Sequence, residues 1–225
     1  MAVALIVAAG RGERLGSELP KALVEVAGRP MLAWSLETLQ SLEAVREIVV
    51  ALPAHALADA AVQFPTIRCV AGGAFRSQSV RLALRAVRQP GPVVVHDAAR
   101  PLAPAALFTC ALEELERHGA DAVVAAAPLS DTVKEVGQDG HLVTHTLDRS
   151  RLWAAQTPQV FRRALLESVL EHASDELLAS ATDDAWLVER AGGVVRVVPT
   201  REPNFKITTA ADLSLAELFL TGRAA

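Results

Sequence analysis

The stretch that decides the fold is Ala4-Leu-Ile-Val-Ala-Ala-Gly-Arg-Gly-Glu-Arg-Leu-Gly-Ser-Glu-Leu-Pro-Lys21. The apolar run from Val3 to Ala9 predicts a buried strand, and it leads directly into a loop that holds three glycines. Glycine lets a backbone bend sharply or approach a ligand closely. Because Arg14 and Lys21 stand in the same loop, the pattern is typical of a first strand whose loop cradles a polyphosphate.

Two common phosphate-binding loops do not fit this stretch. The dinucleotide fingerprint requires Gly-x-Gly-x-x-Gly, but Leu15 occupies its third glycine position. The acidic residue expected at the end of the second strand is also missing, because residues 48–52 run into Pro53. The P-loop requires a Gly-Lys pair, which the sequence does not contain. We therefore interpret Arg14 and Lys21 together as functional cations.

Length and composition favour one α/β domain over residues 1–225, since the chain is 51% hydrophobic and carries a formal net charge of -4. Mild acidity and few aromatic residues argue against a nucleic-acid partner. No segment reaches the ~20 apolar residues of a membrane span. Cys69 and Cys110 form neither a metal spacing nor a disulfide framework, which indicates reduced thiols and a cytoplasmic protein.

Apolar runs alternate with amphipathic stretches along the chain, which predicts a Rossmann-like, mostly parallel sheet flanked by helices. The expected strands are Val3–Ala8, Glu47–Leu52, Ile67–Val70, Val93–His96, Ala122–Ala126 and Val194–Val198. The expected helices are Met31–Ser41, Ala54–Val62, Gln78–Val87, Pro104–His118, Arg162–His172, Asp183–Ala191 and Ala210–Leu220. Ligands of such sheets bind at the carboxyl ends of the strands.

One segment interrupts the alternation. Asp139-Gly140 is a hairpin turn signal, and its flanks, 132–136 and 141–147, are strand-like. The predicted sheet has no position for this hairpin, so we expect it to form a projecting β-arm over about 131–149. A two-stranded ribbon is marginal alone; it either packs on another surface, such as a second subunit, or is a surface ribbon without a role.

The second functional motif is Val93-Val-Val-His-Asp97-Ala-Ala-Arg-Pro101, an apolar strand that ends in an acid. A carboxylate there suits Mg²⁺, which proteins hold with few side chains plus substrate phosphates; the alternative is a turn or helix cap. Arg100 could anchor the loop or a phosphate. In Gly72-Gly73-Ala-Phe-Arg-Ser-Gln-Ser79, a glycine pair opens a helix, and Ser79 either reads a base edge or caps that helix.

Polar groups gather in four later pieces, which are Asp148-Arg149, Gln156-Thr157-Pro-Gln159, Ala181-Thr182-Asp183-Asp184 and Asn204-Phe-Lys206-Ile-Thr208. We expect Lys206 in a short strand, although a cap at Thr182 and a solvated Lys206 are simpler interpretations. No Gly-x-Ser-x-Gly elbow, cysteine–base pair or zinc spacing occurs. Cations, one acid and glycine loops fit direct transfer at phosphorus, which depends on positioning and charge neutralisation.

With these motifs in hand, the chain resembles the 2-C-methyl-D-erythritol 4-phosphate cytidylyltransferase family of the non-mevalonate isoprenoid pathway. The match spans nearly the whole chain, in the family's order, and the block His96-Asp-Ala-Ala-Arg-Pro101 is its most specific part. The resemblance implies a nucleotidyltransferase-type fold, CTP and methylerythritol phosphate as substrates, Mg²⁺ as cofactor, and a homodimer in which the arm serves the partner's active site.

The resemblance also implies roles for individual residues. Arg14 and Lys21 would stabilise charge at the α-phosphorus of CTP, and Asp97 would lie beside the metal–triphosphate. The nucleotide-binding set would be Ala8, Ala9, Gly10, Gly12, Gly73, Ser79, Ala98 and Arg100. The substrate-binding set would be Thr132, Arg149, Thr157, Thr182, Asp183 and Lys206.

The chain departs from some relatives at Ala74, where they carry an acidic residue, so base selectivity would depend on backbone groups and Ser79. Three other functions stay open from the sequence. A ribitol 5-phosphate cytidylyltransferase would share the loop and use another acceptor. A non-catalytic CTP-binding regulator would have no need of both Arg14 and Lys21. A nicotinamide oxidoreductase is disfavoured by Leu15 and by the missing ribose-binding acid.

Overall fold

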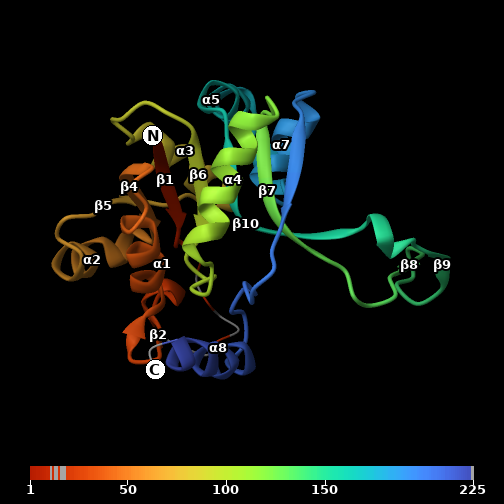
Figure 1. Cartoon of the computed structure of the whole chain (residues 1–225), viewed down its shortest axis with the longest axis horizontal. Coiled ribbons are helices and arrows are strands. Elements are labelled where there is room, and N and C mark those ends of the chain that lie inside the picture. The colour runs from red at the N-terminus through yellow and green to blue at the C-terminus, as the bar shows by residue number, and fades with distance from the viewer. Residues whose placement is uncertain (11, 13–14, 16–18, 224–225) are drawn as a thin grey trace.

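A seven-stranded sheet forms the centre of the part of the chain that the computed structural model describes, residues 1–10, 12, 15 and 19–223 (Figure 1). In spatial order its strands are β11 (Val195–Pro199), β7 (Ala122–Pro128), β10 (Trp153–Phe161), β6 (Val93–Asp97), β1 (Ala2–Val7), β4 (Val45–Leu52) and β5 (Arg68–Ala71). Only β10 runs antiparallel, between β6 and β7. The predicted mostly parallel sheet is therefore confirmed.

Helices cover both faces of this sheet. One face packs against α1 (Met31–Gln40), α2 (Leu57–Gln63) and α4 (Ala105–Arg117). The other face packs against α3 (Arg76–Arg85), α5 (Arg163–His172), α6 (Asp175–Ser180) and α7 (Asp184–Arg190). The last helix, α8 (Ala210–Arg223), packs instead with the small ribbon of β2 (Glu25–Val26) and β3 (Arg29–Pro30). Short 3-10 turns within the described residues include η2 (Lys21–Leu23), η3 (Ala54–Ala56) and η4 (Arg149–Arg151).

The first strand is apolar along its length because both of its faces are buried. Ala4 and Ile6 belong to the core on one face of the sheet, whereas Val3 and Leu5 belong to the core on the other. Successive side chains of a strand point to opposite faces, so a strand covered on both sides needs an unbroken apolar run. This run fixes β1 at the centre of the sheet and places the glycine loop at its carboxyl end.

Six predicted strands are confirmed, with bounds that move by one or two residues. The sequence missed β10, α6 and the β2–β3 ribbon, and the expected helix 54–62 divides into η3 and α2. The prediction of a short strand around Lys206 is wrong, because residues 203–208 form neither a strand nor a helix. A backbone hydrogen bond of 2.8 Å from the Ile207 N–H to the Ala99 carbonyl holds this segment close to the end of β6.

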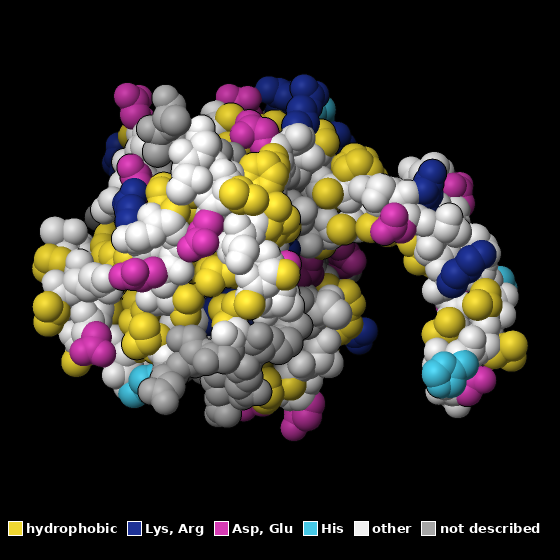
Figure 2. Space-filling model, turned by 90° about the horizontal axis from the view of Figure 1, so that it is seen from below, with side chains coloured by type: hydrophobic (Ala, Val, Ile, Leu, Met, Phe, Trp, Pro, Cys, Tyr) yellow, Lys and Arg dark blue, Asp and Glu magenta, His cyan; other side chains and the backbone are white. Residues whose placement is uncertain are grey.

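The predicted hairpin arm is present as β8 (Lys134–Val136) paired with β9 (Val143–Thr146). Asp139 stabilises its turn, since Oδ1 accepts hydrogen bonds of 3.1 Å from the backbone N–H groups of His141 and Leu142. Figure 2 shows the arm as a separate projection from the body. Exposed apolar side chains lie along it and at its base: Val136, Leu142, Val143, Leu147 and Trp153.

In the described part of the chain, no helix has the length and apolar character needed to cross a membrane.

Candidate active site

A cavity of about 210 Å³ lies at the carboxyl ends of β1 and β6, which are neighbours at the centre of the sheet. The strand order reverses between them, because β4 and β5 lie on one side of β1 and β6 lies on the other. Its walls combine backbone from three loops with three cations and one acid. The residues that line it are Val7, Ala8, Ala9, Gly10, Lys21, Ala22, Gly73, Ala74, Phe75, Arg76, Ser79, Asp97, Ala98, Ala99 and Lys206. This is the edge of the sheet at which we expected a ligand.

Close packing between loops explains two of the glycines. A Cβ on Gly72 would lie 2.4 Å from the Ala9 Cβ, so any side chain there would separate two walls of the cavity. Gly12 has a φ of +71°, and a Cβ on it would lie 2.8 Å from the Lys21 Cβ. The absence of a side chain at Gly12 therefore allows Lys21, which lines the cavity, to take its observed position.

Ser79 supports the glycine loop from α3. Its buried Oγ accepts a hydrogen bond from the Gly73 N–H at 3.0 Å and donates one to the Phe75 carbonyl at 3.1 Å. Phe75 occupies the N-cap position of α3, so the alternative that Ser79 caps this helix is wrong. Recognition of a base edge by Ser79 stays a prediction.

Asp97 is the last residue of β6 and lies at the bottom of the cavity, only 6% exposed. Its Oδ1 accepts a hydrogen bond from Arg76 Nε at 3.1 Å, and its Oδ2 accepts one from Lys206 Nζ at 2.8 Å. Burial alone would raise the pKa of Asp97, but the charges of Arg76 and Lys206 outweigh burial and hold that pKa below its ordinary value. Asp97 is therefore ionised in the resting protein.

A second cavity of about 290 Å³ adjoins the first. Arg76, Asp97 and Lys206 line both cavities, so an acid and two cations stand at their junction. The other residues of the second cavity are Arg100, Ala155, Gln156, Thr157, Gln159, Thr182 and Asp183. Thr157, Thr182, Asp183 and Lys206, predicted to bind one substrate, are thus brought together. Asp183 caps α7 by accepting the Trp186 N–H, so the simpler interpretation of Thr182 as a cap is wrong.

Thr157 connects β10 to the acid of β6. Its Oγ1 accepts the backbone N–H of Asp97 at 3.0 Å and lies 2.9 Å from His96 Nδ1. His96 is fully buried against the Phe108 ring, and burial lowers the pKa of His96 to about 4. A neutral imidazole therefore supports Thr157.

Arg100 lies on the second cavity and is absent from the lining of the first. Its Nη1 donates a hydrogen bond of 2.7 Å to the Asn204 carbonyl, two residues before Lys206. Asn204 in turn donates from Nδ2 to the Thr157 carbonyl at 2.9 Å. These bonds match the loop-anchoring alternative for Arg100, because they hold the segment that carries Lys206.

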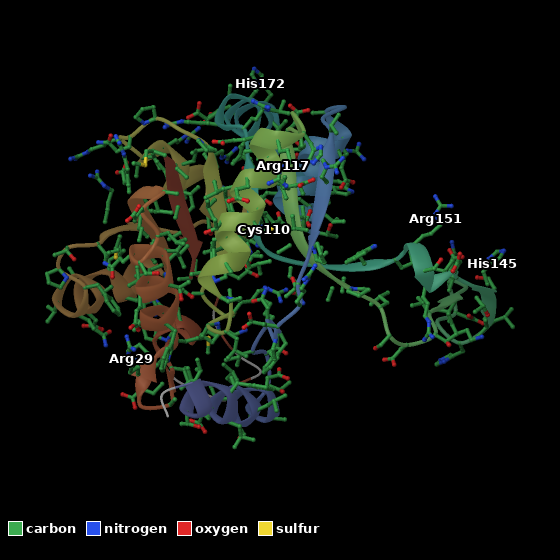
Figure 3. All side chains as sticks on the ribbon, in the orientation of Figure 1. Arg29, Cys110, Arg117, His145, Arg151 and His172 are labelled. Carbon is green, nitrogen blue, oxygen red and sulfur yellow. The ribbon has the colours of Figure 1, made fainter. Side chains whose placement is uncertain are left out.

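Two of the predicted substrate-binding residues, Thr132 and Arg149, line neither cavity of this chain. Thr132 and Arg149 lie exposed on the arm, and Arg149 donates a hydrogen bond to the Ser130 carbonyl. Figure 3 shows their neighbourhood, with Arg151 and His145 on the arm and away from the body. Arg14 lies outside the described residues.

Sequence reasoning assigned no role to Arg76 and Asp184, although both stand inside quoted motifs. Arg76 donates hydrogen bonds to Asp97 and to the fully buried Asp184. The arginine after the glycine pair was the available signal. Among the described residues, no group of three or more His, Cys, Asp or Glu side chains could hold a metal ion.

Comparison with known proteins identifies the relatives of this chain. The sequence profile described as 2-C-methyl-D-erythritol 4-phosphate cytidylyltransferase matches residues 2–222. An enzyme of that name from Nocardia farcinica is 47% identical over 99% of this chain and 95% of its own, and one from Saccharopolyspora erythraea is 45% identical over 97% and 98%.

A solved structure agrees with the sequence comparisons. The 4-diphosphocytidyl-2C-methyl-D-erythritol synthase from Anaerococcus prevotii superimposes with a TM-score of 0.84 at 30% identity and covers 98% of both chains. The likeness therefore extends over nearly the whole chain. The chain belongs to the 2-C-methyl-D-erythritol 4-phosphate cytidylyltransferase family.

Proposed function

We infer that this chain transfers CMP from CTP to 2-C-methyl-D-erythritol 4-phosphate, giving 4-diphosphocytidyl-2-C-methyl-D-erythritol and pyrophosphate in non-mevalonate isoprenoid biosynthesis. Membership of the family supports the reaction. The observation that carries it is the junction of two cavities at Asp97, Arg76 and Lys206. CTP bound in one cavity and the sugar phosphate bound in the other would meet at this junction, beside the cations Arg76 and Lys206.

The reaction we propose is an in-line attack at phosphorus. A phosphate oxygen of the sugar phosphate attacks the α-phosphorus of CTP, and the bond to pyrophosphate breaks. The attacking phosphate is already ionised at neutral pH, so no general base is required. Lys21, together with Arg14, neutralises the charge that develops in the transition state. Lys21 lines the first cavity, which supports its part.

The first cavity is the proposed cytidine site. Backbone groups of Ala8, Ala9, Gly10, Gly73 and Ala98 line it, and backbone N–H and carbonyl groups can read the polar edge of a base. Ser79 holds the Gly73 amide in place. Since Ala74 has no polar side chain, we assign base selectivity to the backbone and to Ser79.

The second cavity is the proposed site of the sugar phosphate. Lys206 supplies the cation for its phosphate group, and Thr157, Thr182 and Asp183 line the wall. We propose that Arg100 serves this site by holding the Asn204 carbonyl. Loss of the Lys206 charge would chiefly raise KM for the sugar phosphate.

We propose Mg²⁺ as the cofactor. A single carboxylate fits this ion, because Mg²⁺ in nucleotide enzymes takes one or two carboxylates and fills its other positions with phosphate oxygens and water. Asp97, ionised and open to the cavity, is the residue that would hold it. When bound, the ion supplies positive charge to the triphosphate.

We also propose a homodimer in which the arm completes the partner's site. Thr132 and Arg149 stand on a projecting ribbon, away from the cavities of their own chain. The exposed apolar side chains of the arm support contact with another surface. The chain then acts as one nucleotidyltransferase domain over residues 1–225, in the cytoplasm, where its free cysteines would stay reduced.

The test is pyrophosphate release from CTP and Mg²⁺, with methylerythritol phosphate and ribitol 5-phosphate as parallel acceptors. We expect release with methylerythritol phosphate alone. Release with ribitol 5-phosphate alone would change the acceptor and keep the chemistry. If folded protein binds CTP and releases nothing with either acceptor, the chain is a regulator and our inference is wrong.

A further inference from the structure

Asp184 is a buried carboxylate that the proposed reaction does not use. It is the first residue of α7 and is 0% exposed. Its Oδ2 accepts a hydrogen bond from Arg76 Nη1, and its Oδ1 has no partner among the described residues. Burial raises the pKa of Asp184, while the charge and hydrogen bond of Arg76 oppose that rise and favour the ionised carboxylate. A buried charge is costly unless it is paired, so the pairing with Arg76 requires an explanation.

Arg76 extends this pairing to the reaction centre. Its Nη1 is held by Asp184, and its Nε donates to Asp97 Oδ1 at 3.1 Å. Asp97 Oδ2 accepts from Lys206 Nζ at 2.8 Å. Four charges of alternating sign therefore run from α7 through α3 and the end of β6 to the segment that carries Lys206. Three of the four line both cavities.

The planar guanidinium makes this arrangement directional. Arginine presents its donors in a rigid fork, so a carboxylate that holds Nη1 also fixes the direction in which Nε points. Asp184 in this way orients the bond that Asp97 receives. The negative charge of Asp184 also offsets the positive charge of Arg76. Without it, Asp97 and anionic substrates in the cavities would experience the full charge of Arg76.

The backbone that carries Asp184 is itself fastened to β10. Gln159 Nε2 donates to Asp183 Oδ2 at 2.8 Å, and Gln159 Oε1 accepts the Ala185 N–H at 3.3 Å. The buried Gln159 side chain thus forms hydrogen bonds with the residues on both sides of Asp184. A buried ion pair stabilises a fold little more than apolar residues of the same volume would, so stability alone does not account for it.

We propose that Asp184 is a positioning residue for the transfer reaction: through Arg76 it orients the Asp97 carboxylate and offsets one positive charge at the junction of the two cavities. This inference rests on the proposed function, since it concerns the same site. Asp184 itself lines neither cavity, and it acts only through Arg76.

The test compares Asp184→Asn with Asp175→Asn, the same change at the first residue of the neighbouring helix α6, where the aspartate is exposed and paired with Arg81. Isothermal titration with CTP in EDTA measures affinity for the nucleotide without metal. Because Asp184→Asn leaves one more positive charge at the junction, we expect CTP to bind about 3- to 10-fold more tightly. Turnover with Mg²⁺ should fall about 10- to 100-fold, because Asp97 loses its orientation. Asp175→Asn should change neither.

A merely structural role would lower both turnover and CTP affinity, together with thermal stability. Unchanged or weaker metal-free CTP binding in Asp184→Asn would overturn the proposal, as would wild-type turnover. Failure of the proposed function is a separate result, because it appears as wild-type protein that binds CTP and releases no pyrophosphate.

A second variant separates folding from positioning if Asp184→Asn does not fold. The double change Arg76→Met with Asp184→Leu removes both buried charges at once, so no unpaired ion remains. It should fold, turn over as slowly as Asp184→Asn, and show no tightening of CTP in EDTA, because the net charge of the site is unchanged. Near-normal turnover of this double variant would contradict the proposal.

Discussion

At the scale of single residues, the contact between Gly12 and Lys21 is open to a direct test. Gly12→Ala would place a Cβ 2.8 Å from the Lys21 Cβ at a φ of +71°. We expect turnover to fall about 10-fold or more, because a small displacement of a charge-stabilising group is costly. Pyrophosphate-release kinetics measure this.

Gly28→Ala is the matched control for Gly12→Ala. Gly28 has a φ of +73°, and a Cβ there would meet nothing within 4 Å. Both variants carry the same backbone strain, and only one of them displaces Lys21. Equal losses of turnover in the two variants would refute the role of the contact.

His96 predicts a dependence of stability on pH. The pKa of His96 is lowered to about 4 by burial, against about 6.5 in an unfolded chain. Between these values the unfolded state binds a proton that the folded state does not, so stability falls as pH falls. From this residue we expect a loss of about 2 kcal/mol between pH 7 and pH 5.

Urea unfolding at both pH values measures that loss. His96→Gln should be less stable at pH 7 and should lose less stability on acidification than the wild type. The exposed His141→Gln serves as the control and should follow the wild-type curve. An identical pH dependence in His96→Gln and the wild type would contradict this assignment.

At the scale of elements, β1 and β6 could be predicted because their apolar runs and terminal polar residues are local features of the sequence. The strand β10 could not, because Pro158 and the polar pair Gln156-Thr157 argue against a strand inside a sheet. The structure accommodates them with a shift of register against β7 between Ala155 and Gln159. That irregular stretch lines the second cavity.

The charged junction was harder to predict than the strands. Asp97 was identified from its place at a strand end, but Arg76 and Asp184 are 108 residues apart in sequence. An aspartate in the first turn of a helix has an ordinary local explanation, because it interacts favourably with the positive end of the helix dipole. Only the packing of α3 and α7 on the same face of the sheet brings the two together.

The N-terminus of α8 supports another prediction at this scale. Asp212 Oδ2 accepts from the Thr208 and Thr209 N–H groups at 2.8 Å, and the Asp212 N–H donates to Thr209 Oγ1. Asp212→Ala removes this reciprocal cap, which is worth about 1 kcal/mol. Because Lys206 stands just before the cap, KM for the sugar phosphate should also rise. Urea unfolding and steady-state kinetics check the two effects.

Asp59→Ala in the first turn of α2 is the control for the α8 cap. It removes an acidic residue near a helix N-terminus far along the chain from Lys206. It should leave KM unchanged. If Asp212→Ala lowers stability and KM stays at the wild-type value, the cap does not support the Lys206 segment.

At the scale of the whole molecule, the proposed homodimer, in which each arm completes the partner's site, predicts complementation between two inactive subunits. A Lys21→Ala chain keeps an intact arm, and an Arg149→Ala chain keeps an intact body. In a mixed dimer, one site then receives both native residues. With random pairing we expect about a quarter of the wild-type activity at low sugar phosphate.

Lys21→Ala mixed with Lys206→Ala is the control for complementation. Both changes lie in the body, so no arrangement of the arms restores a native site. Activity that reappears in this mixture, or fails to reappear with Arg149→Ala, would exclude an arm shared between subunits.

The position of β10 also has a consequence for synthesis of the chain on the ribosome. β6 and β7 are made before β10, yet each pairs with β10 and not with the other. A nascent chain that ends at Pro128 therefore exposes an unpaired edge of β6, which can associate with other nascent chains. Slow translation between residues 129 and 161 would lengthen that exposure, so codon choice across the arm should affect the yield of folded protein.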